Sequence, residues 1–205
     1  MLKEQLVEVA ATLLATSDRP ELLTLRQVAR AAGIAPASIY GHFPNLGALV
    51  AHVLSLRYSE LAQLMDEAAE GAHGPLANLV ARCAAYVAWA VEQPGNYRTL
   101  FSNRMPTDVV PETAHSAGAE ILASVSAALA AVTDANGMRS EDDHWRAGLL
   151  LWTALHGLVS LYNDHGDLPW PPLNVLTAEL LGRHTGEPPA VIITLLPQNW
   201  PRAAT

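Results

Sequence analysis

The chain has 205 residues, half of them hydrophobic, and a formal net charge of −8. This apolar content suffices for a packed interior and the abundance of alanine and leucine favours helix, while no apolar run approaches the roughly 18 residues needed to cross a bilayer. Glu4 and Glu8 interrupt any secretory signal, and Cys83 is the only cysteine, which excludes an internal disulfide. We therefore expect an all-α, soluble, cytoplasmic protein.

The negative charge is unevenly distributed along the sequence. Residues 1–57 contain five basic and four acidic side chains, whereas the remainder contains seven basic and sixteen acidic ones. The first part is therefore compatible with nucleic acid, whose phosphates need basic partners, although its excess of one positive charge is small.

Apolar residues at helical spacing predict a first helix over about residues 1–15, followed by a loop at residues 17–20. Thr24 then stands as an N-cap before a second helix, whose apolar residues recur at i, i+3, i+4 and i+7: Leu25, Val28, Ala29 and Ala32. Gly33 follows, where a left-handed residue ends a helix and turns the chain.

A short third helix is predicted after this turn. Pro36 suits its first position, and Ile39 and Phe43 form an i, i+4 pair that faces inward. Three other side chains of this helix are left outside: Ser38, Tyr40 and His42. Two helices joined at a glycine turn form a helix-turn-helix, whose second helix lies in the DNA major groove.

A long helix is predicted from Leu46, capped by Asn45, to Gly71, with apolar positions at Leu49, Val50, Val53, Leu54, Leu61 and Leu64. Further helices are expected at about residues 75–93, around Tyr97, and at 112–132, 140–163 and 173–184. The tail contains four prolines and is not expected to be helical, although residues 191–196 are apolar enough to dock on the body. The expected organisation is a helix-turn-helix domain at 1-57, a regulatory and dimerisation domain at 58-185, and the Pro-rich tail at 186-205.

Two motifs resemble a known family. The run LRQVARAAGIAP at residues 25–36, followed by SIYGHF at residues 38–43, resembles the DNA-binding domain of the tetracycline-repressor (TetR) family. Trp152-x-x-x-His156-Gly157, after an earlier Pro94-x-x-Tyr97-Arg98-x-x-Phe101 run, resembles the C-terminal domain of a TetR subgroup with a Trp-His-Gly (WHG) signature. The resemblance implies an N-terminal three-helix bundle joined by a long helix to a larger helical domain for ligand binding and dimerisation.

The resemblance also implies a homodimer, formed through helices at about 140-163 and 173-184, that binds a palindromic operator in double-stranded DNA. Tyr40 and His42 are then expected to contact phosphates, Thr24 to anchor the backbone, and the start of the short helix to meet base edges through Pro36, Ala37 and Ser38. Arg26 and Gln27 have the chemistry to read guanine and adenine. Less polar residues, Ala35, Gly41 and Leu46, stand where the family often has capping or basic ones, so we expect modest affinity with a shallow salt dependence.

The resemblance implies, third, a small, mostly apolar effector that binds the C-terminal domain and so releases the operator. The candidate lining residues are Tyr86, Trp89, Tyr97, Phe101, Trp152 and His156. Aromatic residues at helical spacing are equally typical of a core, and a structural role is the better interpretation of Trp152 and His156. Control by a protein partner in place of a small molecule is an alternative that the sequence leaves open.

The remaining alternative is an enzyme, because eight histidines and many carboxylates could supply a metal site or an acid–base site. Residues 141–144, Glu-Asp-Asp-His, are the densest polar cluster, and acidic residues at a helix start explain them. The sequence holds no HExxH motif and no Gly-rich phosphate loop after a strand. We therefore expect no catalytic residues, no metal site and no cofactor.

Overall fold

The computed structural model describes residues 2–101, 106, 112–134, 141–198 and 200, with no side-chain description for 112–117. Every regular element within these residues is a helix, so the all-α prediction is confirmed. None of the helices in this described part is long and apolar enough to cross a membrane. Contacts divide the chain into two compact units, a first unit of Met1–Glu60 with Gln93–Gly118 and a second unit of Leu61–Glu92 with Ala119–Thr205.

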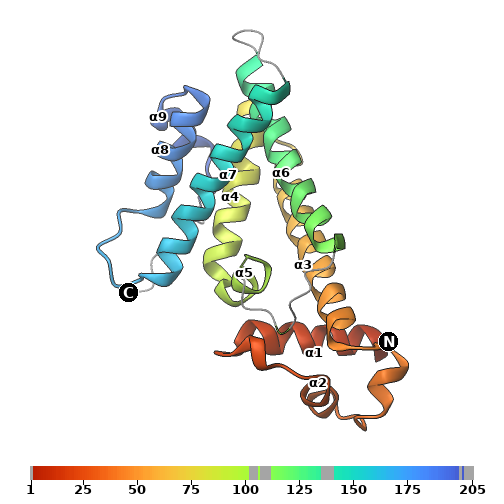
Figure 1. Cartoon of the computed structure of the whole chain (residues 1–205). Coiled ribbons are helices and arrows are strands. Elements are labelled where there is room, and N and C mark those ends of the chain that lie inside the picture. The colour runs from red at the N-terminus through yellow and green to blue at the C-terminus, as the bar shows by residue number, and fades with distance from the viewer. Residues whose placement is uncertain (1, 102–105, 107–111, 135–140, 199, 201–205) are drawn as a thin grey trace. The chain divides into compact units, whose positions relative to one another are not determined.

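The first unit is a small helical bundle (Figure 1). Its elements are α1 (Leu2–Thr16), the 3-10 helix η1 (Pro20–Leu22), α2 (Leu25–Ala31), the 3-10 helix η2 (Ser38–Gly41), the beginning of α3 (Leu46–Ala69) and α5 (Pro94–Phe101). Helix α1 packs against α2 and η1 and also against α5. The core combines apolar side chains of α1, α2, η2 and α3, among them Leu6, Val28, Ile39, Phe43 and Val53. The predicted three-helix arrangement around the helix-turn-helix is therefore present, with α5 as an additional member.

Helix α3 has the predicted start and about the predicted length, and most but not all of its predicted apolar positions are buried. The backbone N–H of Ala48 donates to the Asn45 side-chain oxygen at 2.8 Å, so Asn45 caps the helix as predicted. Leu61, Met65 and Ala69 are buried, whereas Leu64 is exposed. The buried stripe advances in steps of four residues here, and Leu64 falls beside it. Leu64 is thus an apolar position of the predicted helix that lies outside its buried stripe.

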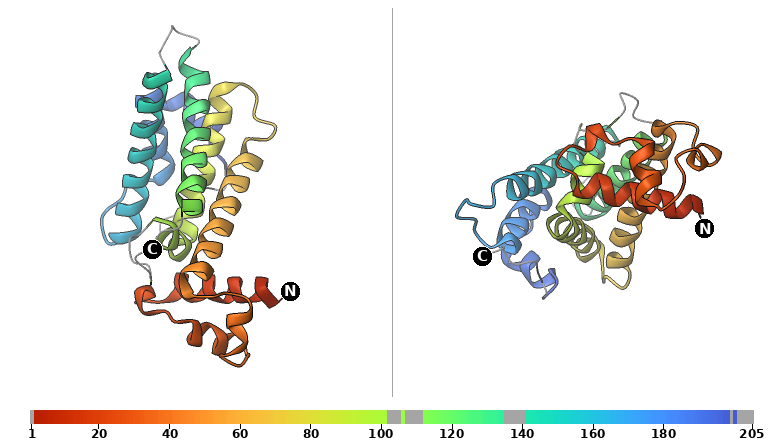
Figure 2. Two further views of the ribbon diagram at one scale, coloured as in Figure 1. Left: turned by 45° about the vertical axis from the view of Figure 1, so that its right-hand side comes forward. Right: turned by 90° about the horizontal axis from the view of Figure 1, so that it is seen from below.

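The second unit contains the end of α3 from Leu61, α4 (Pro75–Glu92), the part of α6 (Glu112–Thr133) from Ala119, and α7 (Glu141–Asp164), α8 (Leu173–Thr185) and α9 (Pro189–Leu195). Helices α4, α6 and α7 lie side by side (Figure 2), and α7, α8 and α9 pack in succession. A Cβ on Gly148 of α7 would lie 2.8 Å from the Cα of Ser126 on α6, so this glycine permits a very close approach of the two helices. Ser140, the first residue of the helix predicted at 140–163, lies outside the described residues.

The tail contains a helix that was not predicted. Pro188 is the N-cap of α9 and Pro189 its first residue, a position where the missing N–H and the fixed φ of proline do no harm. Gly186, with φ +81°, turns the chain back after α8. Ile192 and Leu196 are buried, so the expected docking of this segment is confirmed although its expected lack of helix was wrong.

Candidate functional site

Helix α2 begins at a capping box and ends at a left-handed glycine, where the turn of the helix-turn-helix starts. The Thr24 hydroxyl accepts from the backbone N–H of Gln27 at 3.3 Å, and the Gln27 side-chain oxygen accepts from the backbone N–H of Thr24 at 2.8 Å. This capping box satisfies two backbone donors at the start of α2. At the other end Gly33 has φ +73°, the left-handed conformation that glycine adopts most readily. Both predicted boundaries of α2 are confirmed.

The second helix of the motif is shorter and tighter than predicted. Residues 38–41 form the 3-10 helix η2 rather than an α-helix over residues 37–42, and Ala37 makes no side-chain capping hydrogen bond. Ile39 and Phe43 are buried as predicted, and Phe43 is enclosed further by His52, whose ring centroid lies 5.5 Å away. This inward pair fixes the rotation of η2, so that 55% of Tyr40 is exposed.

All eight predicted DNA-contacting residues are exposed and belong to the first unit: Thr24, Arg26, Gln27, Pro36, Ala37, Ser38, Tyr40 and His42. They lie on α2 and its N-cap, on the turn after α2, and on η2 and its C-cap. The structure therefore brings them together on one part of one unit. A rigid short helix that exposes a phenol, a hydroxyl and an imidazole offers hydrogen-bonding groups to phosphates and base edges.

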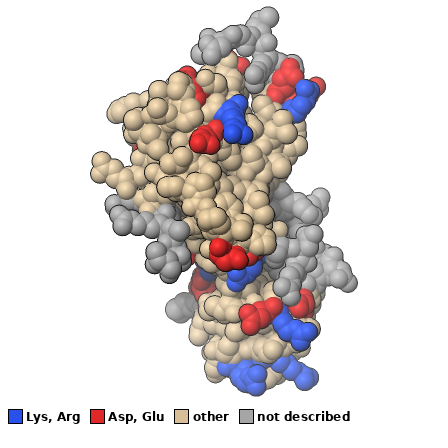
Figure 3. Space-filling model, turned by 90° about the vertical axis from the view of Figure 1, so that its left-hand side faces the viewer, with Lys and Arg blue, Asp and Glu red and all other residues tan. Residues whose placement is uncertain are grey.

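Three arginines supply the positive charge around this motif. Arg19, Arg26 and Arg30 are exposed, and none of them forms an ion pair with any residue that the structure describes. Arg57, by contrast, is held by Glu8 and by Glu60, the latter at 2.5 Å. Lys and Arg side chains gather at the end of the first unit shown lowest in Figure 3. The sequence prediction omitted Arg30, although its place four residues after Arg26 on one helix was a readable signal.

A second group of candidate residues forms an aromatic cluster within the second unit. The Tyr86 hydroxyl and His156 Nδ1 are 2.8 Å apart, and the Trp152 and His156 rings pack edge to face with centroids 4.5 Å apart. Tyr86 is buried completely, and Trp89 almost completely. Burial lowers the pKa of His156 to about 4, so its imidazole is neutral near pH 7. These four candidates lie on α4 and α7, which pack against each other.

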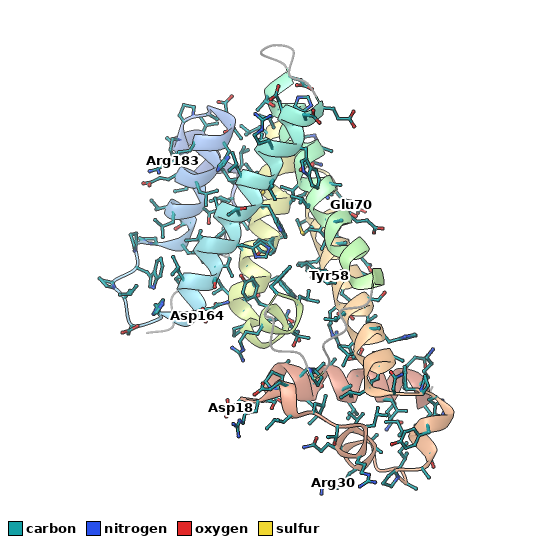
Figure 4. All side chains as sticks on the ribbon, viewed as in Figure 1. Asp18, Arg30, Tyr58, Glu70, Asp164 and Arg183 are labelled. Carbon is teal, nitrogen blue, oxygen red and sulfur yellow. The ribbon has the colours of Figure 1, made fainter. Side chains whose placement is uncertain are left out.

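The other two candidate ligand residues lie in the first unit. Tyr97 and Phe101 of α5 have ring centroids 5.2 Å apart, and Phe101 packs against Tyr58 of α3 at 5.8 Å. The Tyr58 hydroxyl donates to the carbonyl oxygen of Leu100 at 3.0 Å (Figure 4 labels Tyr58). The six predicted lining residues are therefore divided between the two units, four in the second and two in the first.

Comparisons with known proteins identify the family. The model described as bacterial regulatory proteins of the tetR family matches residues 4–53, which include the whole helix-turn-helix. The model described as the tetracyclin repressor-like C-terminal domain matches residues 79–181, half of the chain. The chain belongs to the TetR family. Its members are DNA-binding transcriptional regulators with a helix-turn-helix, and the WHG signature of residues 152–157 is consistent with the C-terminal match.

Solved structures share the fold at low sequence identity. A protein of unknown function from Rhodococcus sp. RHA1 is 22% identical with a TM-score of 0.73, over 97% of this chain and 96% of that one. RolR in complex with resorcinol is 15% identical with a TM-score of 0.63, over 99% and 96%. FadR from Bacillus subtilis in complex with stearoyl-CoA is 13% identical with a TM-score of 0.71, over 89% and 97%. No curated protein matched this TetR-family chain.

Proposed function

We propose that this TetR-family regulator is a repressor that binds a palindromic operator as a homodimer and leaves it when a small, mostly apolar effector binds. The observation that carries the proposal is the orientation of η2, whose apolar residues Ile39 and Phe43 are buried while Tyr40 is exposed. Because buried side chains fix the orientation of η2, each subunit of a dimer presents the same polar groups to the major groove of its half-site.

The contacts of α2 assign its two candidate base readers different roles. Arg26 is exposed without an ion pair among the described residues, so its guanidinium is available to bind guanine O6 and N7 together. The Gln27 oxygen already accepts two hydrogen bonds from Thr24, each 2.8 Å long. A bidentate contact to adenine needs that oxygen, so Gln27 contributes only its amide donors. Arg26 is therefore the stronger determinant of sequence preference.

The exposed side of α7 supports dimerisation. Leu150, Thr153, Gly157 and Leu161 recur at i, i+3, i+7 and i+11, and all four are exposed in the single chain. A Cβ on Gly157 would meet nothing within 4 Å, so contacts inside the chain do not explain a glycine that costs about 1 kcal/mol relative to alanine in a helix. Close approach of a second helix at Gly157 does explain it. The exposed side of α7 thus supports a dimer helix at 140-163, the first of the two predicted.

The aromatic cluster of the second unit supports an effector site. Tyr86, Trp152 and the neutral His156 combine apolar ring faces with one polar pair, which suits an apolar or aromatic molecule with an oriented hydroxyl or carbonyl group. Two structures of similar fold contain bound small molecules: RolR holds resorcinol, an aromatic diol, and FadR holds stearoyl-CoA, which carries a long acyl chain. The proposed effector of this chain is nearer to the first in size and in its aromatic character.

Helix α5 offers a route from effector to operator. It follows α4 directly in the chain and packs against α1 within the first unit. Gly95 makes that contact close, since a Cβ there would lie 2.3 Å from the carbonyl oxygen of Ala15. A displacement of α4 on effector binding is therefore transmitted to α1 by packing, and operator and effector oppose each other reciprocally.

Fluorescence anisotropy with an operator duplex tests the proposal. Tyr40→Ala and His42→Ala are expected to abolish or strongly weaken binding while leaving the melting temperature within about 2 °C, because both side chains are exposed. His73→Ala, an exposed change in the loop after α3, serves as the matched control. Wild-type affinity in the Tyr40 and His42 variants rules out η2 as the DNA-reading helix.

A further inference from the structure

A groove beside the DNA-reading residues has not been assigned a role. It has a volume of about 440 Å³ and lies within the first unit, between the α1–α2 connection and the outer side of α2. Its polar lining includes Arg19, Gln27 and Arg30, and its apolar lining includes Leu13, Leu22 and Ala31. Leu22 is 56% exposed, so the apolar part of the groove is open to solvent.

The charges of the groove favour an anion. Arg19 and Arg30 line it from two separate segments, and neither is neutralised by an ion pair with a described residue. Asp18 and Glu21 lie in the same connection, but Glu21 is only partly exposed and is engaged in another interaction. Figure 4 shows Arg30 at the outer edge of the unit. Two guanidinium groups beside exposed apolar surface are complementary to a phosphodiester chain, in which anionic phosphates alternate with apolar sugar carbons.

The groove is continuous with the proposed operator-binding surface. Gln27 belongs to both, and Arg30 follows Arg26 by one turn of α2. A duplex that contacts Arg26 and η2 extends naturally past Arg30 towards Arg19. We propose that Arg19 and Arg30 bind the DNA backbone immediately outside the half-site that η2 reads. This inference depends on the proposed operator binding.

The flanking contacts have a definite role in affinity. The first unit has few free basic residues, because Arg57 is paired with Glu8 and Glu60 and the start of α3 carries Leu46 instead of a cation. Arg19 and Arg30 add one phosphate contact each per half-site. Each contact strengthens binding about fivefold at 0.15 M salt, and it makes the fall of log affinity with log salt steeper by about 0.9.

A length series of operator duplexes tests this inference with the full chain. On a duplex with long flanks, Arg19→Ala and Arg30→Ala are each expected to weaken binding about fivefold per half-site. Each should make the salt dependence shallower by about 0.9 per half-site, or about 1.8 for the two half-sites of a dimer. On a duplex trimmed to the half-sites, both variants are expected to bind as the wild type does. Arg98→Ala, which removes an exposed charge from α5 of the same unit, is the matched control.

The possible outcomes separate the two proposals. If the wild type binds no selected DNA, operator binding itself is refuted. If the wild type binds but the variants keep its affinity and slope on long duplexes, only the flanking contact is overturned. An equal loss on long and trimmed duplexes overturns it as well, because the arginines then act inside the half-site. Circular dichroism melts confirm that each variant is folded.

Discussion

The contact between α5 and α1 yields the sharpest prediction about how an effector signal reaches the DNA-binding unit. Substitution of Gly95 by alanine adds a methyl group whose carbon would lie 2.3 Å from the Ala15 carbonyl oxygen and 3.2 Å from the Ala15 Cβ. Carbon–oxygen contacts settle at about 3.3 Å or more, so the two helices must separate by about 1 Å. The obstacle is backbone, which cannot rotate away as a side chain can.

Such overpacking costs about 1–3 kcal/mol in stability, and the cost falls on the contact proposed to transmit the signal. Gly95→Ala is therefore expected to lower the free energy of unfolding by that amount. It is also expected to reduce the factor by which an effector weakens operator binding. The operator affinity of the effector-free protein should change less than this factor does, because η2 and its core are untouched.

Denaturant unfolding and operator titrations with and without effector measure both effects. Gly166→Ala is the control, because a Cβ at that position meets nothing within 4 Å and φ is not positive there. A Gly95→Ala protein with wild-type stability and the full effector response refutes the proposed α5–α1 route.

Three further predictions concern the reading helix, the buried histidine and the dimer. Ile39→Ala is expected to destabilise the protein by about 2–5 kcal/mol, because it empties a buried site, whereas Tyr40→Ala stays within about 0.5 kcal/mol; equal losses in chemical denaturation contradict the assigned rotation of η2. Because the folded pKa of His156 is lowered to about 4 from its ordinary 6.5, the unfolded chain binds the proton first, and stability is full above pH 6.5 and falls by up to about 3 kcal/mol as the pH drops towards 4. His156→Gln should flatten that dependence in urea melts between pH 4 and 7, and an unchanged slope excludes His156 as its source. Gly157→Leu is expected to weaken self-association at least tenfold in sedimentation experiments while the monomer remains folded, and an intact dimer moves the interface off this side of α7.

Local signals made the helix-turn-helix predictable. The Thr24 cap, the left-handed Gly33 and the inward pair Ile39 and Phe43 each depend on residues at most four positions apart, and the structure has all of them. The tail prediction failed because prolines end helices in most positions, whereas Pro189 stands where a helix accepts one.

The features that the sequence did not predict depend on packing between residues far apart in the chain. Tyr97 and Phe101 share the aromatic character of Tyr86 and Trp152, so the sequence placed them in one candidate set, but α5 folds onto α1 and takes them into the first unit. The predicted domains, 1-57 and 58-185, stay predictions. The compact units divide the chain differently, because they place Gln93–Gly118 together with Met1–Glu60. The groove lined by Arg19 and Arg30 is formed by the α1–α2 connection together with α2. The periodicity of a single helix does not show that two such segments lie next to each other.

The central claim is that η2, held by Ile39 and Phe43, reads the DNA major groove as half of a twofold pair. Selection of duplexes from a random pool by the full-length protein tests it most directly. The expected product is an inverted repeat with half-site centres about one helical turn, or a multiple of it, apart, and the enrichment should disappear with Tyr40→Ala. An unenriched pool, or the same repeat selected by the Tyr40 variant, contradicts the claim.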